Sequence, residues 1–112
     1  MLEKRPLINL LYDFYGPLLT DRQRTLMELY YEQDLSLGEI ADQCGITRQG
    51  VHDGLKRAGE ALERYEEKLG LVNRHLAQRE RLERLRAELE RMTGPETERI
   101  RNMLRELLGY EG

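Results

Sequence analysis

The sequence predicts an all-α protein in which a helix-turn-helix domain is followed by a C-terminal helical extension. Apolar residues recur at intervals of three and four along most of the chain, which is the period of one face of an α-helix. Charged residues make up 35% of the 112 residues and aromatic residues only 6%, a balance typical of exposed, charge-rich helices. We expect the helix-turn-helix domain over residues 1–70 and the charged extension over residues 71–112.

The first two helices are marked by a proline and by a capping box. Pro6 suits the first turn of a helix, and the Gly16–Pro17 pair breaks the pattern that follows. Thr20 and Gln23 have the spacing of a capping box, in which each side chain binds the backbone amide of the other residue. The second helix then runs to about Tyr31. The apolar stripes of these helices are Leu7, Leu10, Leu11, Phe14, Leu18, Leu26, Met27, Tyr30 and Tyr31.

A second capping box and a glycine turn predict the helix-turn-helix itself. Ser36 and Glu39 begin a short third helix, which stops near Cys44 and Gly45 because glycine readily adopts the left-handed conformation of a tight turn. Thr47 then caps a fourth helix. Two short helices joined by a tight turn that contains glycine are the helix-turn-helix pattern. The residues expected beneath them are Leu37, Ile40, Ala41, Ile46, Val51 and Leu55.

The residues after the fourth helix predict a charged helical hairpin. Gly70 ends the fourth helix, Asn73 can cap the next one, and the Thr93–Pro95 turn precedes a last helix that ends at Gly109. A narrow apolar stripe runs along the first helix of this hairpin, and it consists of Leu76, Leu82, Leu85, Leu89 and Met92.

Two interpretations of this extension are open. From residue 70 to residue 112 it carries nine Arg and eight Glu, so it can be a solvated surface stabilised by pairs of Glu and Arg. Alternatively, Leu82, Leu85 and Leu89 bury against a second copy of the chain, because a helix with so narrow a stripe cannot form a core alone. We favour the homodimer.

Several function classes find no support in the sequence. The single cysteine, Cys44, has no second thiol for a disulfide or a metal site, and neither His52 nor His75 has a partner at ligand spacing. No Gly-rich phosphate loop or catalytic triad order is present, so we expect neither an enzyme nor a cofactor or metal. No run approaches the roughly 18 apolar residues of a membrane span. We expect a cytoplasmic protein that binds a partner macromolecule.

The candidate binding surface is the start of the fourth helix. In a helix-turn-helix that reads DNA, the first exposed side chains of the second helix meet the base edges. Arg48 can pair with guanine and Gln49 with adenine, while other side chains are placed for phosphates. The residues expected to contact nucleic acid or another partner are Thr47, Arg48, Gln49, His52, Lys56 and Arg57.

The charge balance opposes strong independent binding to DNA. The formal net charge is −3 at pH 7, and the segment from Thr20 to Leu69 has seven basic residues against eleven acidic ones, a net charge of −4. Asp53 falls among the candidate contact residues and would repel a phosphate. Basic residues clustered on one face would favour DNA as the partner, whereas a face of mixed charge would favour a protein.

Two glycines lie four residues apart in the same helix. Gly50 and Gly54 each weaken a helix by about 1 kcal/mol relative to alanine. They can form a smooth groove that another helix or a nucleic-acid backbone approaches closely, or they can be tolerated in a helix that Val51 and Leu55 hold in place.

The run from Leu19 to Leu69 resembles region four of bacterial sigma factors, and it is more similar still to the YlxM family. The matching segments are LYDFY at Leu11–Tyr15, ELYYEQDLSLGEIA at Glu28–Ala41, ITRQGV at Ile46–Val51 and YEEKLGL at Tyr65–Leu71. The resemblance implies a sigma region four-like fold of the winged-helix-like DNA-binding superfamily.

The resemblance also implies a function. Genes of the YlxM family are associated with components of the signal recognition particle, so we expect a regulatory or adaptor protein that binds the particle's protein or RNA through the face from Arg48 to Arg57. The alternative is a transcription regulator that reads DNA as a dimer, with the C-terminal helices setting the half-site spacing. A third hypothesis, mimicry of region four towards a sigma factor or polymerase, is permitted by the fold alone.

Overall fold

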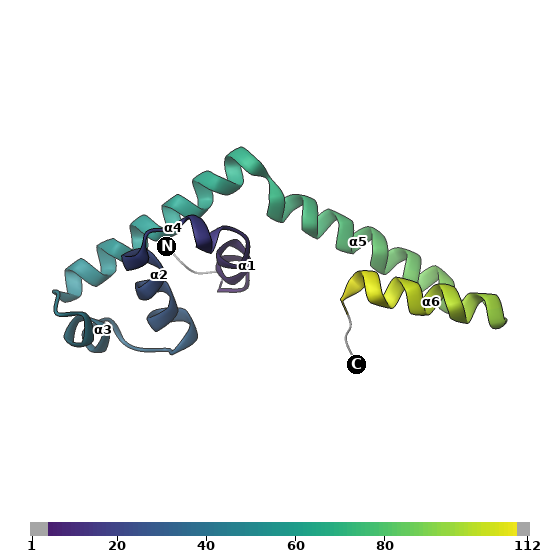
Figure 1. Ribbon diagram of the computed structural model, residues 1–112, viewed down its shortest axis with the longest axis horizontal. Helices are drawn as coiled ribbons and strands as arrows, with labels where there is room; N and C mark the ends of the chain where they lie inside the picture. The colour runs from purple at the N-terminus through teal and green to yellow at the C-terminus, as the bar shows by residue number, and fades with distance from the viewer. Residues whose placement is uncertain (1–4, 110–112) are drawn as a thin grey trace. The chain divides into compact units, whose positions relative to one another are not determined.

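A computed structural model describes residues 5–109 of the chain (Figure 1). Within these residues every regular element is a helix, which confirms the predicted all-α class. The elements are α1 (Arg5–Tyr15), η1 (Gly16–Leu18), α2 (Asp21–Met27), η2 (Glu28–Glu32), α3 (Leu37–Cys44), α4 (Arg48–Leu69), α5 (Leu71–Glu90) and α6 (Pro95–Leu108). The fold divides into two compact units between Val72 and Asn73, and each is described separately below. None of the described helices is both long and apolar enough to cross a membrane.

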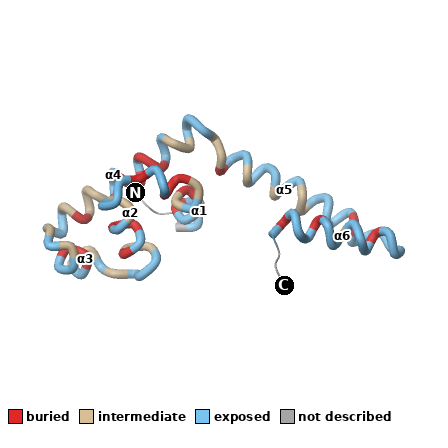
Figure 2. Tube along the Cα trace, in the orientation of Figure 1, coloured by how far each residue is buried: buried red, intermediate tan, exposed pale blue. Residues whose placement is uncertain are grey.

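The core of the first unit lies between α1, α2, α3 and α4. Figure 2 marks buried positions on each of these helices. The largest fully buried side chains of this core are Tyr15, Leu26, Met27, Ile40, Val51, Leu55, Leu62 and Val72. Leu18, which the sequence pattern assigned to the first apolar stripe, is 54% exposed because α1 ends at Tyr15 and Gly16–Leu18 form a short 3-10 turn.

The capping box at the start of α2 is present, and the segment ends in a π-helical turn. Thr20 accepts a hydrogen bond from the Gln23 amide, and the Gln23 side chain accepts one from the Thr20 amide. Beyond Met27 the helix widens into the π-helical element η2, whose last turn is closed by the Gln33 amide donating to the Glu28 carbonyl at 3.1 Å. The segment is thus helical to Glu32, close to the predicted end near Tyr31, and its last turn is π-helical.

Residue 54 is a glycine because α2 packs closely against α4 at this position. A Cβ atom on residue 54 would overlap the δ1 methyl group of Leu26, which is 1% exposed in the core. The close approach is made by a helix of the same chain, so of the two interpretations of this glycine the structure supports a close helix contact. Gly50 has no comparable clash, since its nearest neighbour would be the Thr47 hydroxyl at 3.1 Å.

The start of α5 is capped by side chains from α1 and α4. Gly70 ends α4 in the left-handed conformation, with φ of 63°, and α5 begins at the next residue. The hydroxyl of Tyr15 accepts a hydrogen bond from the Leu71 amide at 3.0 Å and donates one to Glu66 at 2.6 Å. Glu66 in turn accepts from the Val72 amide at 2.9 Å. The prediction that Asn73 caps this helix is therefore wrong, because Asn73 lies inside its first turn.

The second unit is a hairpin of α5 and α6. Its buried hydrophobic residues are Leu89, Leu104 and Leu108, with Leu82 packed against them. An arginine from each helix also caps the end of the other. Arg101 of α6 donates to the carbonyl oxygens of Leu89 and Met92 at 3.1 and 2.7 Å, and Arg79 of α5 donates to the Leu108 carbonyl at 2.9 Å.

This hairpin changes the interpretation of the leucines expected at a dimer interface. Leu89 is buried against α6 of its own chain and is not available to a second copy, while Leu82 is half-buried beside it. Leu85 is 50% exposed and does not belong to this small core. The prediction missed this difference because, although a hairpin was expected, the sequence does not specify which leucines of its first helix face the second helix.

Candidate helix-turn-helix interface

The helix-turn-helix is formed by α3, a three-residue turn and the start of α4. Ser36 and Glu39 form the predicted capping box, with hydrogen bonds of 2.9 and 3.0 Å. Gly45 adopts the left-handed conformation with φ of 69°, and the Thr47 side chain caps α4 by accepting from the Gly50 amide at 2.9 Å. These local signals fix where α4 begins, and they thereby fix which side chains its first turns present.

The core beneath the turn holds the two helices together. Ile40 and Val51 are fully buried, and Leu55 and Ala41 are 1% and 5% exposed. Ala41, which the sequence placed beneath the two helices, is buried there, and its small side chain suits a close helix crossing. The opposite side of α4 is left to solvent, and of the predicted contact residues on it Thr47, Arg48, Gln49, Lys56 and Arg57 are exposed while His52 is half-buried.

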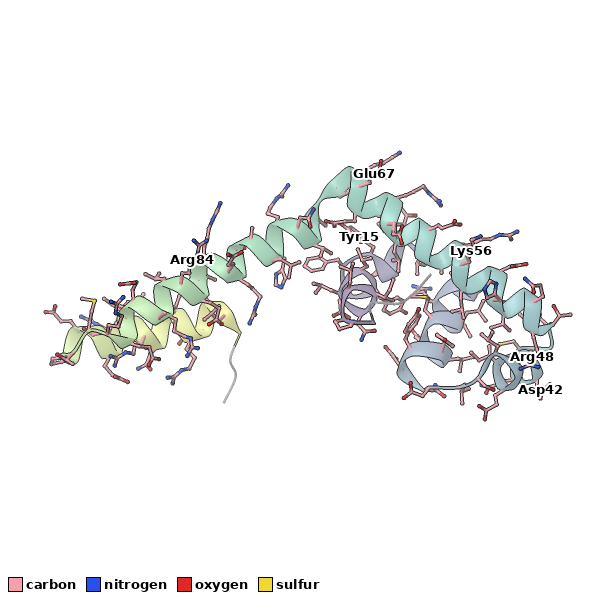
Figure 3. The ribbon with its side chains drawn as sticks, turned by 180° about the vertical axis from the view of Figure 1, so that it is seen from behind. Tyr15, Asp42, Arg48, Lys56, Glu67 and Arg84 are labelled. Carbon is pink, nitrogen blue, oxygen red and sulfur yellow. The ribbon has the colours of Figure 1, made fainter. Side chains whose placement is uncertain are left out.

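Arg48 is held against α3. Its Nε atom lies 3.4 Å from the position that a Cβ atom on Gly38 would occupy, so the guanidinium group rests on the glycine of the preceding helix. Figure 3 shows Arg48 at the start of α4, and Lys56 two turns further along the same helix. The contact between Gly38 and the Arg48 side chain could not be predicted from the sequence, because the two residues belong to different helices.

Asp53 lies at the centre of the candidate face. The Gln49 amide donates to its carboxylate at 2.9 Å, and the His52 Nδ1 atom lies 3.5 Å from the same carboxylate oxygen. These contacts, led by the hydrogen bond from Gln49, hold the pKa of Asp53 below its usual range. Asp53 is therefore ionised at neutral pH, and the side chain of Gln49 is engaged within the helix. The spacing of four residues between them was a usable sequence signal.

The far end of the face also carries both charges. Asp53, Lys56, Arg57 and Glu60 line a shallow surface hollow of about 310 Å³. A carboxylate lies on each side of the two cations along the helix, so the face has no continuous basic stripe of the kind that follows a phosphate backbone.

A second hollow of about 310 Å³ lies on another side of the first unit, between α1 and the α2–η2 segment. The carboxylates of Asp13, Glu28 and Glu32 line it. The other lining residues are Asn9, Tyr12, Met27 and Tyr31. The Tyr12 hydroxyl donates to Glu28 at 2.6 Å. These carboxylates would repel a nucleic acid, so a phosphate backbone would bind more favourably at α4. Within residues 5–109 no group of three or more His, Cys, Asp or Glu residues is placed to hold a metal ion.

Fold and surface together define a small helix-turn-helix protein with a helical hairpin after the helix-turn-helix unit. A family model described as "Putative helix-turn-helix protein, YlxM / p13 like" matches residues 2–103. The chain belongs to this family, UPF0122, which confirms the resemblance found in its sequence.

Relatives from several bacteria carry the same family name. A UPF0122 protein of Geobacillus kaustophilus is 48% identical over 107 residues, which cover 96% of each chain. One from Caldanaerobacter subterraneus is 56% identical over 79 residues, covering 70% of this chain and 68% of the relative. One from Desulforamulus reducens is 66% identical over 67 residues, covering 60% and 57%. These names give a family and no partner.

Proposed function

We propose that this protein is a non-catalytic regulatory or adaptor protein of the signal recognition particle pathway that acts in the cytoplasm. It binds a component of the particle through the exposed face of α4, using Thr47, Arg48, Gln49, His52, Lys56 and Arg57. The link to the particle rests on the family resemblance. The observation that supports an adaptor over a DNA reader is the mixed charge of this face.

The position of Asp53 carries that argument. A duplex bound along α4 would bring phosphates near an ionised carboxylate whose pKa is lowered by Gln49. Gln49 would also have to give up its hydrogen bond to Asp53 before it paired with a base. A protein surface can instead meet each charge of the face with an opposite charge, whereas RNA, like DNA, would bring phosphates close to Asp53.

The alternative is a transcription regulator that binds DNA as a dimer. It is supported by the helix-turn-helix fold itself and by three exposed cations of α4, the second helix of that motif: Arg48, Lys56 and Arg57. In this case the carboxylates of Asp53 and Glu60 would lie beside the major groove, where they would weaken the affinity for DNA.

A salt-dependent binding titration tests these proposals. The full chain is titrated against signal recognition particle RNA, the particle's GTPase protein and duplex DNA, together with the variants Arg48→Ala and Lys56→Ala. Lys68→Ala is the matched control, because Lys68 is an exposed cation of the same helix in its last turn, outside the candidate face.

The adaptor proposal expects saturable binding to one component of the particle that both variants weaken and the control does not. On RNA, each variant that loses a phosphate contact should also lower the slope of log affinity against log salt by about 1. Asp53→Asn separates the partner classes, since it should strengthen binding to RNA and weaken binding to a basic protein surface. Steeply salt-dependent binding to DNA alone, lost in both variants, would support the alternative. No binding to any particle component would contradict the adaptor role.

A further inference from the structure

The hairpin of α5 and α6 presents a row of large apolar side chains to solvent. Leu85 on α5 and Ile100, Met103 and Leu107 on α6 are between 47% and 69% exposed. We call these four residues the C-terminal apolar face. They are distinct from Leu89, Leu104 and Leu108, which pack against one another between the two helices.

The four side chains lie on the same side of the hairpin. Ile100, Met103 and Leu107 follow the three- and four-residue spacing of one helix face, turned by about a quarter of a circle from the inward Leu104 and Leu108. Leu85 is turned in the same sense from the inward direction of α5. Since the two helices of a hairpin run antiparallel, equal rotations in the same sense place side chains on one common face.

The hairpin has too little core to be stable through its own packing. Three buried leucines, with Leu82 beside them, are a small core for two helices of 20 and 14 residues. The C-terminal apolar face adds roughly 400 Å² of exposed apolar surface, the size of the largest patch on a typical monomer. Burying it on two copies, with a polar rim, gives an interface near the lower end of the standard range of about 1,200–2,000 Å².

The charges around the hairpin suit a second copy of the chain. From residue 70 to residue 112 there are nine Arg and eight Glu. Arg91 pairs with Glu88 at 3.0 Å and Arg101 with Glu98 at 2.8 Å, so both signs are interleaved along both helices. A strongly acidic or basic partner would find no complementary field here, whereas two copies approach without net repulsion.

We propose that the C-terminal apolar face is a homodimer interface, in which two hairpins related by a two-fold axis form a four-helix bundle. A two-fold contact brings the same patch of each copy together, so one apolar face is sufficient. Leu85, Ile100, Met103 and Leu107 become its core positions, while Leu82 and Leu89 remain part of each hairpin. The interface is independent of which macromolecule α4 binds.

Sedimentation equilibrium of the full chain over a range of concentrations tests this interface. The double variant Met103→Glu with Leu107→Glu places four carboxylates in the dimer interface and should shift the protein to monomer, weakening self-association by at least 100-fold. Leu76→Glu is the matched control, because Leu76 is a 46% exposed leucine of α5 on the opposite side of the hairpin. It should leave the dimer intact.

Thermal unfolding followed by circular dichroism provides a second measurement. The midpoint should rise with protein concentration for the unmodified chain and the Leu76→Glu control, and it should be independent of concentration in the double variant. If the double variant fails to fold, Leu85→Lys on the other helix decides the question with the same two measurements. A chain that is monomeric at every concentration, or a dimer that survives these substitutions, would overturn the proposal.

Discussion

The side chain of Leu26 in α2 occupies the space that a Cβ atom on Gly54 of α4 would need. Leu26 is 1% exposed, so its δ1 methyl group is surrounded by the core and has little room to move. This contact sets how closely α2 can approach α4, and α4 is the helix that presents the candidate interface.

Gly54→Ala should therefore destabilise the protein, even though alanine is the better helix former. Overpacking costs typically about 1–3 kcal/mol and the gain in helix propensity is about 1 kcal/mol, so we expect a net loss of roughly 1 kcal/mol in the free energy of unfolding. Urea denaturation measures this difference. In a Leu26→Ala background the same substitution should become neutral or stabilising, since the obstructing methyl group is gone. An equal loss in both backgrounds would show that the clash is not the cause.

Tyr15→Phe should destabilise the junction of α4 and α5. The change keeps the buried ring but removes the hydroxyl that accepts from the Leu71 amide and donates to Glu66. A loss on the order of 1–2 kcal/mol is expected, because two partly buried partners lose a hydrogen bond. Tyr12→Phe is the control, since its hydroxyl makes one exposed bond to Glu28 and its loss should cost less. Hydrogen exchange at the Leu71 and Val72 amides should accelerate in Tyr15→Phe alone.

Stability should fall in alkaline solution as the tyrosines ionise. Burial, and then the hydrogen bond to Glu28, raise the pKa of Tyr12 to about 12, and burial with the bond to Glu66 also raises the pKa of Tyr15. The folded protein thus keeps protons that the unfolded chain releases near pH 10, so this contribution is complete below pH 10 and is lost as the pH rises towards 12. Urea midpoints across this range should fall less steeply in Tyr12→Phe. Identical slopes in the two proteins would contradict the assignment.

Ser36→Ala should weaken the first helix of the helix-turn-helix. The substitution removes the side chain that caps α3, at a typical cost of about 1 kcal/mol. The Ser36 amide, and then its hydroxyl, lower the pKa of Glu39, so the capping box contributes stability above the unfolded pKa near 4.5 and loses it as the pH falls. An NMR titration of the Glu39 carboxyl should show its pKa rising in Ser36→Ala. The same titration in Thr20→Ala, which removes the cap of α2, should leave Glu39 unchanged.

Most of the helix-turn-helix could be predicted from the sequence because its signals are local. The two capping boxes, the left-handed Gly45 and the Thr47 cap involve residues within three or four positions of each other. Backbone hydrogen bonding over such short distances does not depend on the rest of the fold. The candidate contact residues follow directly, since the start of α4 determines which side chains its first turns expose.

The sequence by itself thus determined the helical class, the family and the point at which α4 begins. Only the tertiary structure decided that Leu26 requires a glycine at residue 54, that Tyr15 and Glu66 cap α5, and that Leu89 is buried while Leu85 is exposed. Tyr15 and Leu71 are separated by 56 positions, and no periodicity within a single helix specifies which partner a side chain finds at that distance. Contacts of this kind depend on how the helices pack, which the whole chain determines together.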